Sequence, residues 1–169
     1  MKQTPRILEA DSKNLLLAAK DLFLEYERSL PFDLDFQNFE EEVSHLPGEY
    51  SRPDGCILVA LVGKKPAGCV ALRKLDQDIC EMKRLYIRPE FRGRRIGRRM
   101  AETIIAGAKE LGYKKMRLDT VSGMTGAIAL YRSLGFKEIS QYRVNPLPDA
   151  MFFELDLVNE KTTQSIKNG

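Results

Sequence analysis

The stretch Arg92-Gly93-Arg94-Arg95-Ile96-Gly97 marks the point where the chain leaves an apolar strand and enters an amphipathic helix. The run Ile79–Ile87 precedes it, and apolar residues recur after it at helical spacing. The first N–H groups of a helix have no partner within the helix, and the helix dipole favours negative charge beside them. Gly93 and Gly97 let the backbone approach a ligand closely, and the arginines add positive charge. The stretch therefore predicts a strand–turn–helix unit that binds a phosphate-bearing anion.

The basic residues around this turn indicate a small anion rather than a nucleic acid. Between Lys83 and Arg99 there are eight basic residues and one acidic residue, Glu90, but the whole chain has a net charge of only +3. Only Tyr86 and Phe91 interrupt the basic run with rings on which bases could stack. The chain also lacks the Gly-Lys-Ser/Thr of a P-loop and the G-x-G-x-x-G of a dinucleotide fold. We expect no nucleic-acid partner.

Hydrophobic periodicity and turn signals divide the rest of the chain into alternating strands and helices. Strands are expected at Thr4–Glu9, Cys56–Val62, Ala67–Leu75, Ile79–Ile87, Lys115–Thr120, Phe136–Tyr142 and Met151–Leu157. Helices are expected from the Ser12 cap to about Leu30, from Asp35 to the stop at Pro47-Gly48, from Ile96 to Gly112, and over Thr125–Leu134. This order predicts a mixed α/β sheet with helices on both faces.

The length of 169 residues predicts a single domain over residues 1–158, followed by a polar tail at 159–169 that we expect to be disordered. No apolar run approaches the ~20 residues that a membrane span needs, and the first residues lack the pattern of a secretion signal. The chain has three cysteines without a CxxC spacing and one histidine, which argues against disulfides and a metal site. We expect a cytoplasmic protein with no metal and no membrane partner.

A second motif, Ala127-Ile128-Ala129-Leu130-Tyr131-Arg132-Ser133-Leu134-Gly135-Phe136, follows the first by about thirty residues. Together the two motifs resemble those of the GNAT superfamily of N-acetyltransferases, clearly over about 56–157 and more loosely over the first two helices. In the family's cofactor motif, Gln/Arg-x-x-Gly-x-Gly/Ala, Arg92 and Gly97 match, while Arg95 replaces the first glycine. Met124 stands where the family often has an asparagine that contacts the cofactor.

The resemblance implies a single-domain GNAT-like fold and acetyl-CoA as the cofactor. The central sheet would be mixed, mostly antiparallel and twisted, and splayed between its fourth and fifth strands, with helices on both faces. The pantetheine arm of the cofactor would dock like an added strand against the main chain of the fourth strand. The cofactor-binding residues implied in this way are Leu85, Tyr86, Ile87, Arg92, Gly93, Arg94, Arg95, Ile96, Gly97, Arg98, Met124 and Ala127.

The resemblance also implies roles in catalysis. Tyr131 matches the tyrosine that protonates the leaving sulfur in many relatives, and the alternative is a core tyrosine at this helical position. The N–H of Leu85 or Ile87 would stabilise the oxyanion. Glu81 stands where several members carry a general base, and the alternative is a strand carboxylate paired with Lys83 or Arg84. These alternatives stay open at the level of sequence.

The acceptor pocket is expected opposite the cofactor, between the first helix–helix connection and the loop before the final strand. The candidate substrate-binding residues there are Phe32, Asp33, Tyr50, Tyr142 and Asn145. The expected function is acetyl transfer from acetyl-CoA to a primary amine of a small molecule or amino acid. The alternatives are a protein or peptide N-acetyltransferase and a non-catalytic acyl-CoA-binding module. Members of the family are often dimers, so a homodimer is one of the expected assemblies.

Overall fold

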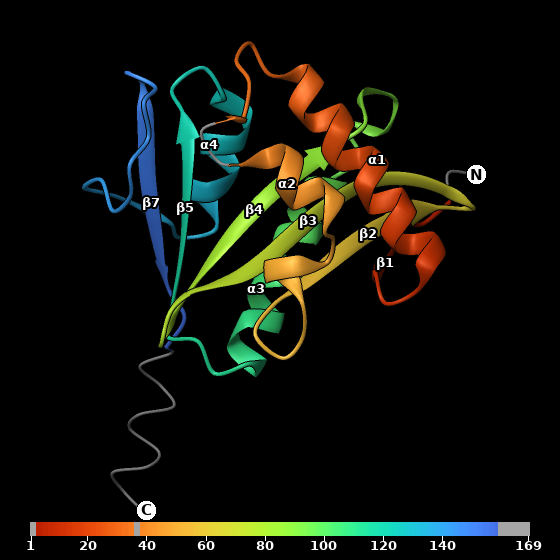
Figure 1. Ribbon diagram of the computed structural model, residues 1–169, viewed down its shortest axis with the longest axis horizontal. Helices are drawn as coiled ribbons and strands as arrows, with labels where there is room; N and C mark the ends of the chain where they lie inside the picture. The colour runs from red at the N-terminus through yellow and green to blue at the C-terminus, as the bar shows by residue number, and fades with distance from the viewer. Residues whose placement is uncertain (1–2, 36–37, 159–169) are drawn as a thin grey trace, which may run out of the picture.

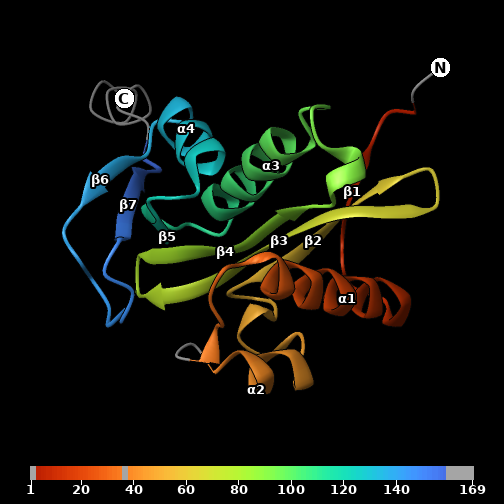
Figure 2. The same ribbon diagram turned by 90° about the horizontal axis from the view of Figure 1, so that it is seen from above.

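The computed structural model describes residues 3–35 and 38–158, which form one seven-stranded sheet with helices on both faces. The strands are β1 (Arg6–Glu9), β2 (Cys56–Val62), β3 (Lys65–Asp76), β4 (Ile79–Ile87), β5 (Lys115–Val121), β6 (Lys137–Ile139) and β7 (Ala150–Asp156). The helices are α1 (Lys13–Ser29), α2 (Phe39–Ser44), α3 (Ile96–Glu110) and α4 (Thr125–Ser133), with short 3₁₀ turns η2 (Gly48–Tyr50) and η3 (Pro89–Phe91). Figure 2 shows α1 and α2 on one face and α3 and α4 on the other. None of the described helices is long and apolar enough to cross a membrane.

Most of the elements expected from the sequence are present, with two clear differences in extent. Helix α1 begins after Ser12, whose side chain accepts a hydrogen bond from the Leu15 N–H at 3.3 Å. Helix α2 begins at Phe39 rather than at Asp35, after Asn38 with a φ of 55°; residues 36–37 lie outside the described residues. The expected strand Phe136–Tyr142 is shortened to β6, because the chain beyond Ile139 leaves the sheet. The tail expected at 159–169 also lies outside the described residues.

Alternation along the central strands builds a separate core on each face of the sheet. Val70 and Met82 face α3 and α4, whereas Cys69, Ala71 and Tyr86 face α1 and α2. The strand order is β1-β2-β3-β4-β5-β7-β6, and all neighbours are antiparallel except β4 and β5. The mixed, mostly antiparallel sheet expected from the sequence is therefore confirmed.

The parallel strands β4 and β5 pair only at their first residues and then separate. Their paired positions are Ile79–Lys115, Cys80–Met116 and Glu81–Arg117. Beyond them β4 follows β3 as far as Ile87, while β5 follows β7 as far as Val121. Figure 1 shows the two strands running apart from this junction, which confirms the expected splay. The facing backbone groups of the two strands thus lose their sheet partner where the cleft opens.

A β-bulge in β4 lies beside this cleft. Arg84 has a φ of 61°, and Arg84 and Leu85 together oppose Val70 because the register shifts there. The left-handed conformation is unfavourable for a residue with a side chain and persists only where the surroundings hold it. Here the Arg84 guanidinium donates to the Glu42 carboxylate at 2.9 and 3.1 Å and lies over the Phe39 ring at 5.2 Å. Helix α2 thus holds the bulge in place.

Candidate active site

A groove runs from the N-terminus of α3 to the cleft between β4 and β5. Ten of the twelve residues predicted to bind the cofactor line it: Leu85, Tyr86, Ile87, Arg92, Gly93, Arg95, Ile96, Gly97, Met124 and Ala127. Tyr26, Ser29, Phe91, Gly126 and Leu130 complete the wall. The two motifs, separated in sequence, therefore lie on one continuous surface.

The turn before α3 leaves room for a ligand at the backbone. A Cβ added to Gly93, which has a φ of 79°, would meet no atom within 4 Å, and one added to Gly97 would meet only Ile87 Cγ1 at 3.5 Å. Space beside the free N–H groups of a helix fits a diphosphate. Arg95 precedes the helix with a φ of 59°, so it adopts the left-handed conformation for which the family's glycine is suited.

Two predicted cofactor arginines turn their side chains away from this groove. Arg94 donates to the Gln3 carbonyl at 3.3 Å, and its guanidinium lies over the Phe91 ring at 5.9 Å. Arg98 donates to Ser133 Oγ at 2.8 Å and pairs with Glu102 at 3.4 Å. Neither residue lines the groove, because both side chains have partners elsewhere in the chain.

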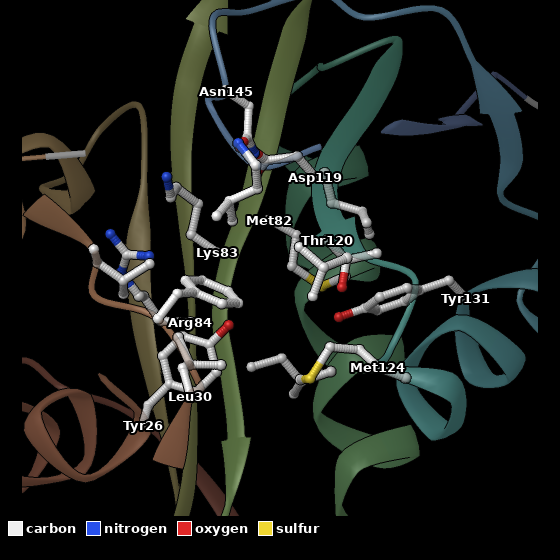
Figure 3. A pocket seen from close by; sticks show the side chains of 17 residues that line it. Tyr26, Leu30, Met82, Lys83, Arg84, Asp119, Thr120, Met124, Tyr131 and Asn145 are labelled. Carbon is white, nitrogen blue, oxygen red and sulfur yellow. The ribbon is translucent and has the colours of Figure 1, made fainter. Parts of the chain in front are cut away.

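The groove meets a second cavity inside the cleft. Tyr26, Leu85, Met124 and Ala127 line both. Figure 3 shows the hydroxyl groups of Tyr26 and Tyr131 pointing into the gap from opposite sides. Among the described residues neither hydroxyl has a hydrogen-bond partner, although phenols in such enclosed positions normally find one. Two phenol groups are therefore available to a ligand at this junction.

Tyr131 is a core residue at its ring and a cavity residue at its hydroxyl. The ring lies 5.8 Å from that of Phe136 and 6.4 Å from that of Phe153, centre to centre. Burial raises the pKa of Tyr131, and the nearby Tyr26 and Asp119 raise it further. The phenol is accordingly protonated near neutral pH and can donate a hydrogen bond.

Glu81 directly precedes the cavity residues Met82 and Lys83 on β4, and its carboxylate is fully buried. It accepts hydrogen bonds from Arg73 at 2.9 Å, from the Tyr142 hydroxyl at 2.6 Å and from Arg143 at 3.1 Å. Burial alone would raise the pKa of Glu81, but Lys83, Arg73 and Arg143 outweigh it and lower the pKa. A carboxylate with these partners is a weak base, and it does not line the cavity.

Of the five predicted acceptor residues, Phe32 and Asn145 line the cavity. Asp33 is exposed and accepts from the Asp35 N–H at 3.2 Å. Tyr50 is a core residue, 2% exposed, with its hydroxyl bonded to Glu42 at 2.7 Å. Tyr142 holds Glu81 instead of facing the cavity. The structure thus places Phe32 and Asn145 in the cavity, and it places Asp33, Tyr50 and Tyr142 outside it.

Three charged cavity residues were not predicted as site residues, Lys83 and Arg84 on β4 and Asp119 on β5. The signal that could have identified them is a charged residue within a central strand that is otherwise apolar. Burying such a charge costs free energy, so its presence there indicates a functional role. Asn145 connects to one of them, because its amide donates to Asp119 at 3.2 Å. The cavity therefore has charged groups on both strands of the cleft.

Comparison with known proteins supports one assignment. The acetyltransferase (GNAT) family model matches residues 17–136. An uncharacterised N-acetyltransferase of Schizosaccharomyces pombe is 39% identical over 140 residues, which cover 82% of this chain and 86% of that protein.

Solved structures share the fold. A GNAT-family acetyltransferase from Staphylococcus aureus superimposes with a TM-score of 0.76 at 20% identity, covering 92% of this chain and 100% of that one. An acetyltransferase from Salmonella typhimurium, solved with its cofactor acetyl-CoA, has a TM-score of 0.67 at 22% identity, covering 92% and 95% of the two chains.

Proposed function

The chain belongs to the GNAT family of acetyltransferases, and on that premise we propose that it transfers the acetyl group of acetyl-CoA to a primary amine of a small molecule or amino acid. The observation that carries the proposal is the meeting of two grooves. The first is the groove that leads from the N-terminus of α3 to the cleft. The second is the cavity into which the Tyr131 hydroxyl points. Leu85 and Ala127 line both. A donor and an acceptor can therefore meet between β4 and β5.

The donor would lie in the groove that the two motifs line. Main-chain N–H groups of the Arg92–Gly97 turn would bind the diphosphate, with Arg92 and Arg95 supplying charge at the wall. The separated edge of β4 at Leu85–Ile87 would take the pantetheine arm, because its groups lack a partner on β5. The Salmonella typhimurium protein of the same fold was solved with acetyl-CoA, which supports the choice of this donor.

Acetyl-CoA supplies a thioester whose carbon is attacked directly by the amine. We propose that the N–H of Leu85 or Ile87 stabilises the negative charge on the thioester oxygen. The amine attacks in its neutral form, after its ammonium group has released a proton to solvent, and the C–S bond breaks as the C–N bond forms. Tyr131 would donate its proton to the departing sulfur, since its hydroxyl faces the cavity and its raised pKa keeps it protonated. The proton released by the new amide nitrogen would then restore the phenol. Its role as a general acid is distinct from the packing role of its ring.

The loop between β6 and β7 favours a small acceptor over a protein or peptide. It is attached to both strands of the cleft, through Tyr142 and Arg143 to Glu81 on β4 and through Asn145 to Asp119 on β5. A peptide acceptor needs a groove that is open at both ends, whereas this loop crosses one end. A non-catalytic acyl-CoA-binding module would not need phenol groups aimed into the cleft.

The proposal is tested by thiol release from acetyl-CoA with amino acids, polyamines, aminoglycosides and peptide N-termini as acceptors. Turnover should occur with at least one small amine. With that amine, Tyr131→Phe should lower kcat about 10²–10⁴-fold and leave the Kd for CoA within about twofold, because the ring still packs. Full turnover by Tyr131→Phe would overturn the role of this residue. Binding of acetyl-CoA without turnover of any amine would indicate the module instead.

A further inference from the structure

Two charged residues of the cavity, Lys83 and Asp119, occupy equivalent places on the parting strands, while the third, Arg84, is bonded to Glu42. Glu81 and Arg117 are the last paired residues of β4 and β5. Lys83 and Asp119 each follow two positions later, so both side chains project from the same face of the sheet. Figure 3 shows Lys83 on the β4 wall and Asp119 on the β5 wall. The open end of the cleft thus carries a cation on one side and an anion on the other.

The surroundings of Lys83 favour a negatively charged ligand. Its side chain is 4% exposed, and its Nζ lies 3.8 Å from Glu81, a carboxylate already bonded by Arg73 and Arg143. Burial lowers the pKa of Lys83 to about 7, and Arg84, Arg73 and Arg143 add to this effect while Glu81 opposes it. An anion in the cavity would stabilise the ammonium form against the surrounding guanidinium groups.

The surroundings of Asp119 favour a positively charged ligand. Its carboxylate accepts the Asn145 amide at 3.2 Å, and no ion pair to it occurs within the described part of the chain. The neighbouring polar groups on its strand and above it, Thr120 and Asn145, carry no charge. An ammonium group beside Asp119 would therefore gain an ion pair without displacing another one.

We infer that the acceptor is a free α-amino acid, whose ammonium group binds Asp119 and whose carboxylate binds Lys83. An α-amino acid carries both charges on one carbon, and the cavity has a cation on the β4 wall and an anion on the β5 wall. Leu30, Phe32 and Leu147 line the same cavity and would contact an apolar side chain. This inference rests on the proposed transferase function and specifies the substrate class.

The test compares acceptors that differ only in the carboxylate. Alanine, leucine, methionine and phenylalanine are each paired with the corresponding decarboxylated amine and with the amino-acid amide. We expect kcat/KM of the wild type to be about 10–100-fold higher for the best amino acid than for its amine, through KM, because a charge-assisted bond is lost. In Lys83→Met the ratio of kcat/KM for the amino acid to kcat/KM for its amine should fall to within about threefold, because the variant loses kcat/KM for the amino acid and not for the amine.

Asp119→Asn provides the second arm, because asparagine keeps an oxygen for Asn145 but loses the charge. This variant should lower kcat/KM for the amino acid and for the amine by similar factors of about 10–100, since both acceptors carry the ammonium group. Lys74→Met, at an exposed lysine of β3, is the matched control and should change neither acceptor.

Calorimetry of the CoA-loaded protein gives a readout besides turnover. Binding of the amino acid at pH 8 should take up protons in the wild type, because a carboxylate next to Lys83 raises the pKa of that lysine. Lys83→Met should abolish the uptake. Asp119, Glu81, Arg73, Arg84 and Arg143 are unchanged in this variant, so the signal reports Lys83.

The outcomes separate this inference from the proposed function. Turnover of amines with no preference for a carboxylate, or an equal loss for both acceptors in Lys83→Met, would refute the inference and leave the transferase intact. An amide that outperforms its free acid would point to a peptide N-terminus and refute it as well. No turnover with any acceptor would instead overturn the proposed function.

Discussion

Glu81 is a buried carboxylate surrounded by cations on three sides, from β3, from its own strand and from the β6–β7 loop. We propose that its role is to attach that loop to the sheet rather than to act as a general base, because its pKa is lowered. Glu81 then fixes the position of the loop beside the cavity, and it does not contact the acceptor.

Glu81→Gln should lower the free energy of unfolding by about 3–5 kcal/mol, because it leaves the guanidinium groups of Arg73 and Arg143 without their buried counter-ion. The pKa of Glu81 is lower in the folded chain than its ordinary 4.5, so the carboxylate stabilises the fold above that pH. This contribution disappears as the pH falls through the folded pKa. In urea unfolding, the free energy of unfolding should fall less between pH 7 and pH 3 for the variant than for the wild type. A neutral-pH limb of kcat/KM that vanishes in the variant would restore Glu81 as a base.

Lys83→Met should be more stable than the wild type at pH 6, because the wild type buries an ammonium group. The pKa of Lys83 is about 7 in the folded chain and ordinarily 10.5, so between these values the unfolded chain binds more protons. Stability of the wild type therefore rises with pH across this window, and the advantage of the variant should shrink from pH 7 to pH 10. Urea midpoints at pH 6, 8 and 9.5 measure it. A constant difference would contradict the lowered pKa.

At the scale of elements, helix α3 contains two glycines that allow cofactor binding and helix stability to be tested separately. Gly97 and Gly107 both lie in this helix, and a Cβ at either position meets no close protein atom. Only Gly97 lines the cofactor groove. The two glycines therefore form a matched pair for testing where the diphosphate lies.

Gly107→Ala should stabilise the fold by about 0.5–1 kcal/mol and leave the Kd for CoA unchanged, because alanine favours the helix. Gly97→Met should keep the Tm near that of the wild type but raise the Kd at least about tenfold, since its long side chain would fill the groove, whereas the family's motif accepts the methyl group of alanine at this position. Thermal melts and titration with CoA measure both effects. Equal CoA affinity for the two variants would move the diphosphate away from this turn.

The bulge in β4 explains why some site residues were predictable from the sequence and others were not. Arg92, Gly97 and Tyr131 belong to local motifs, and the expected groove formed around them. Lys83 was missed because the direction of a side chain next to a bulge depends on pairing with β3, which the local sequence does not encode. Tyr50 was misplaced for a similar reason: its contact with Glu42 depends on how α2 packs.

At the scale of the whole molecule, the splayed sheet is a fold with an unpaired interior edge. Bound CoA should therefore protect amides of residues 82–87 from hydrogen exchange, while amides of β2, which pair on both sides, should change little. Mass spectrometry of peptides with and without CoA measures this difference. Uniform protection of all strands would indicate global stabilisation rather than docking in the cleft.

The general architecture was more predictable than its assembly. The alternation of elements identified the mixed sheet and the two helix layers, since strand and helix periods differ. The placement of β7 between β5 and β6 was not predicted, because it arises from a long-range pairing of Met116 with Leu155 and of Glu138 with Phe153. The proposed homodimer and the cytoplasmic location stay predictions.

The junction of the two grooves at Tyr26, Leu85, Met124 and Ala127 also constrains the order of events in turnover. The grooves extend from it in different directions, one toward α3 and one toward the β6–β7 loop, so each reactant has its own entrance. The three cysteines are buried elsewhere, and none lines either groove. Without a thiol at the junction to carry the acetyl group between two half-reactions, both reactants must be present together. The enzyme should therefore work through a ternary complex rather than by a ping-pong scheme.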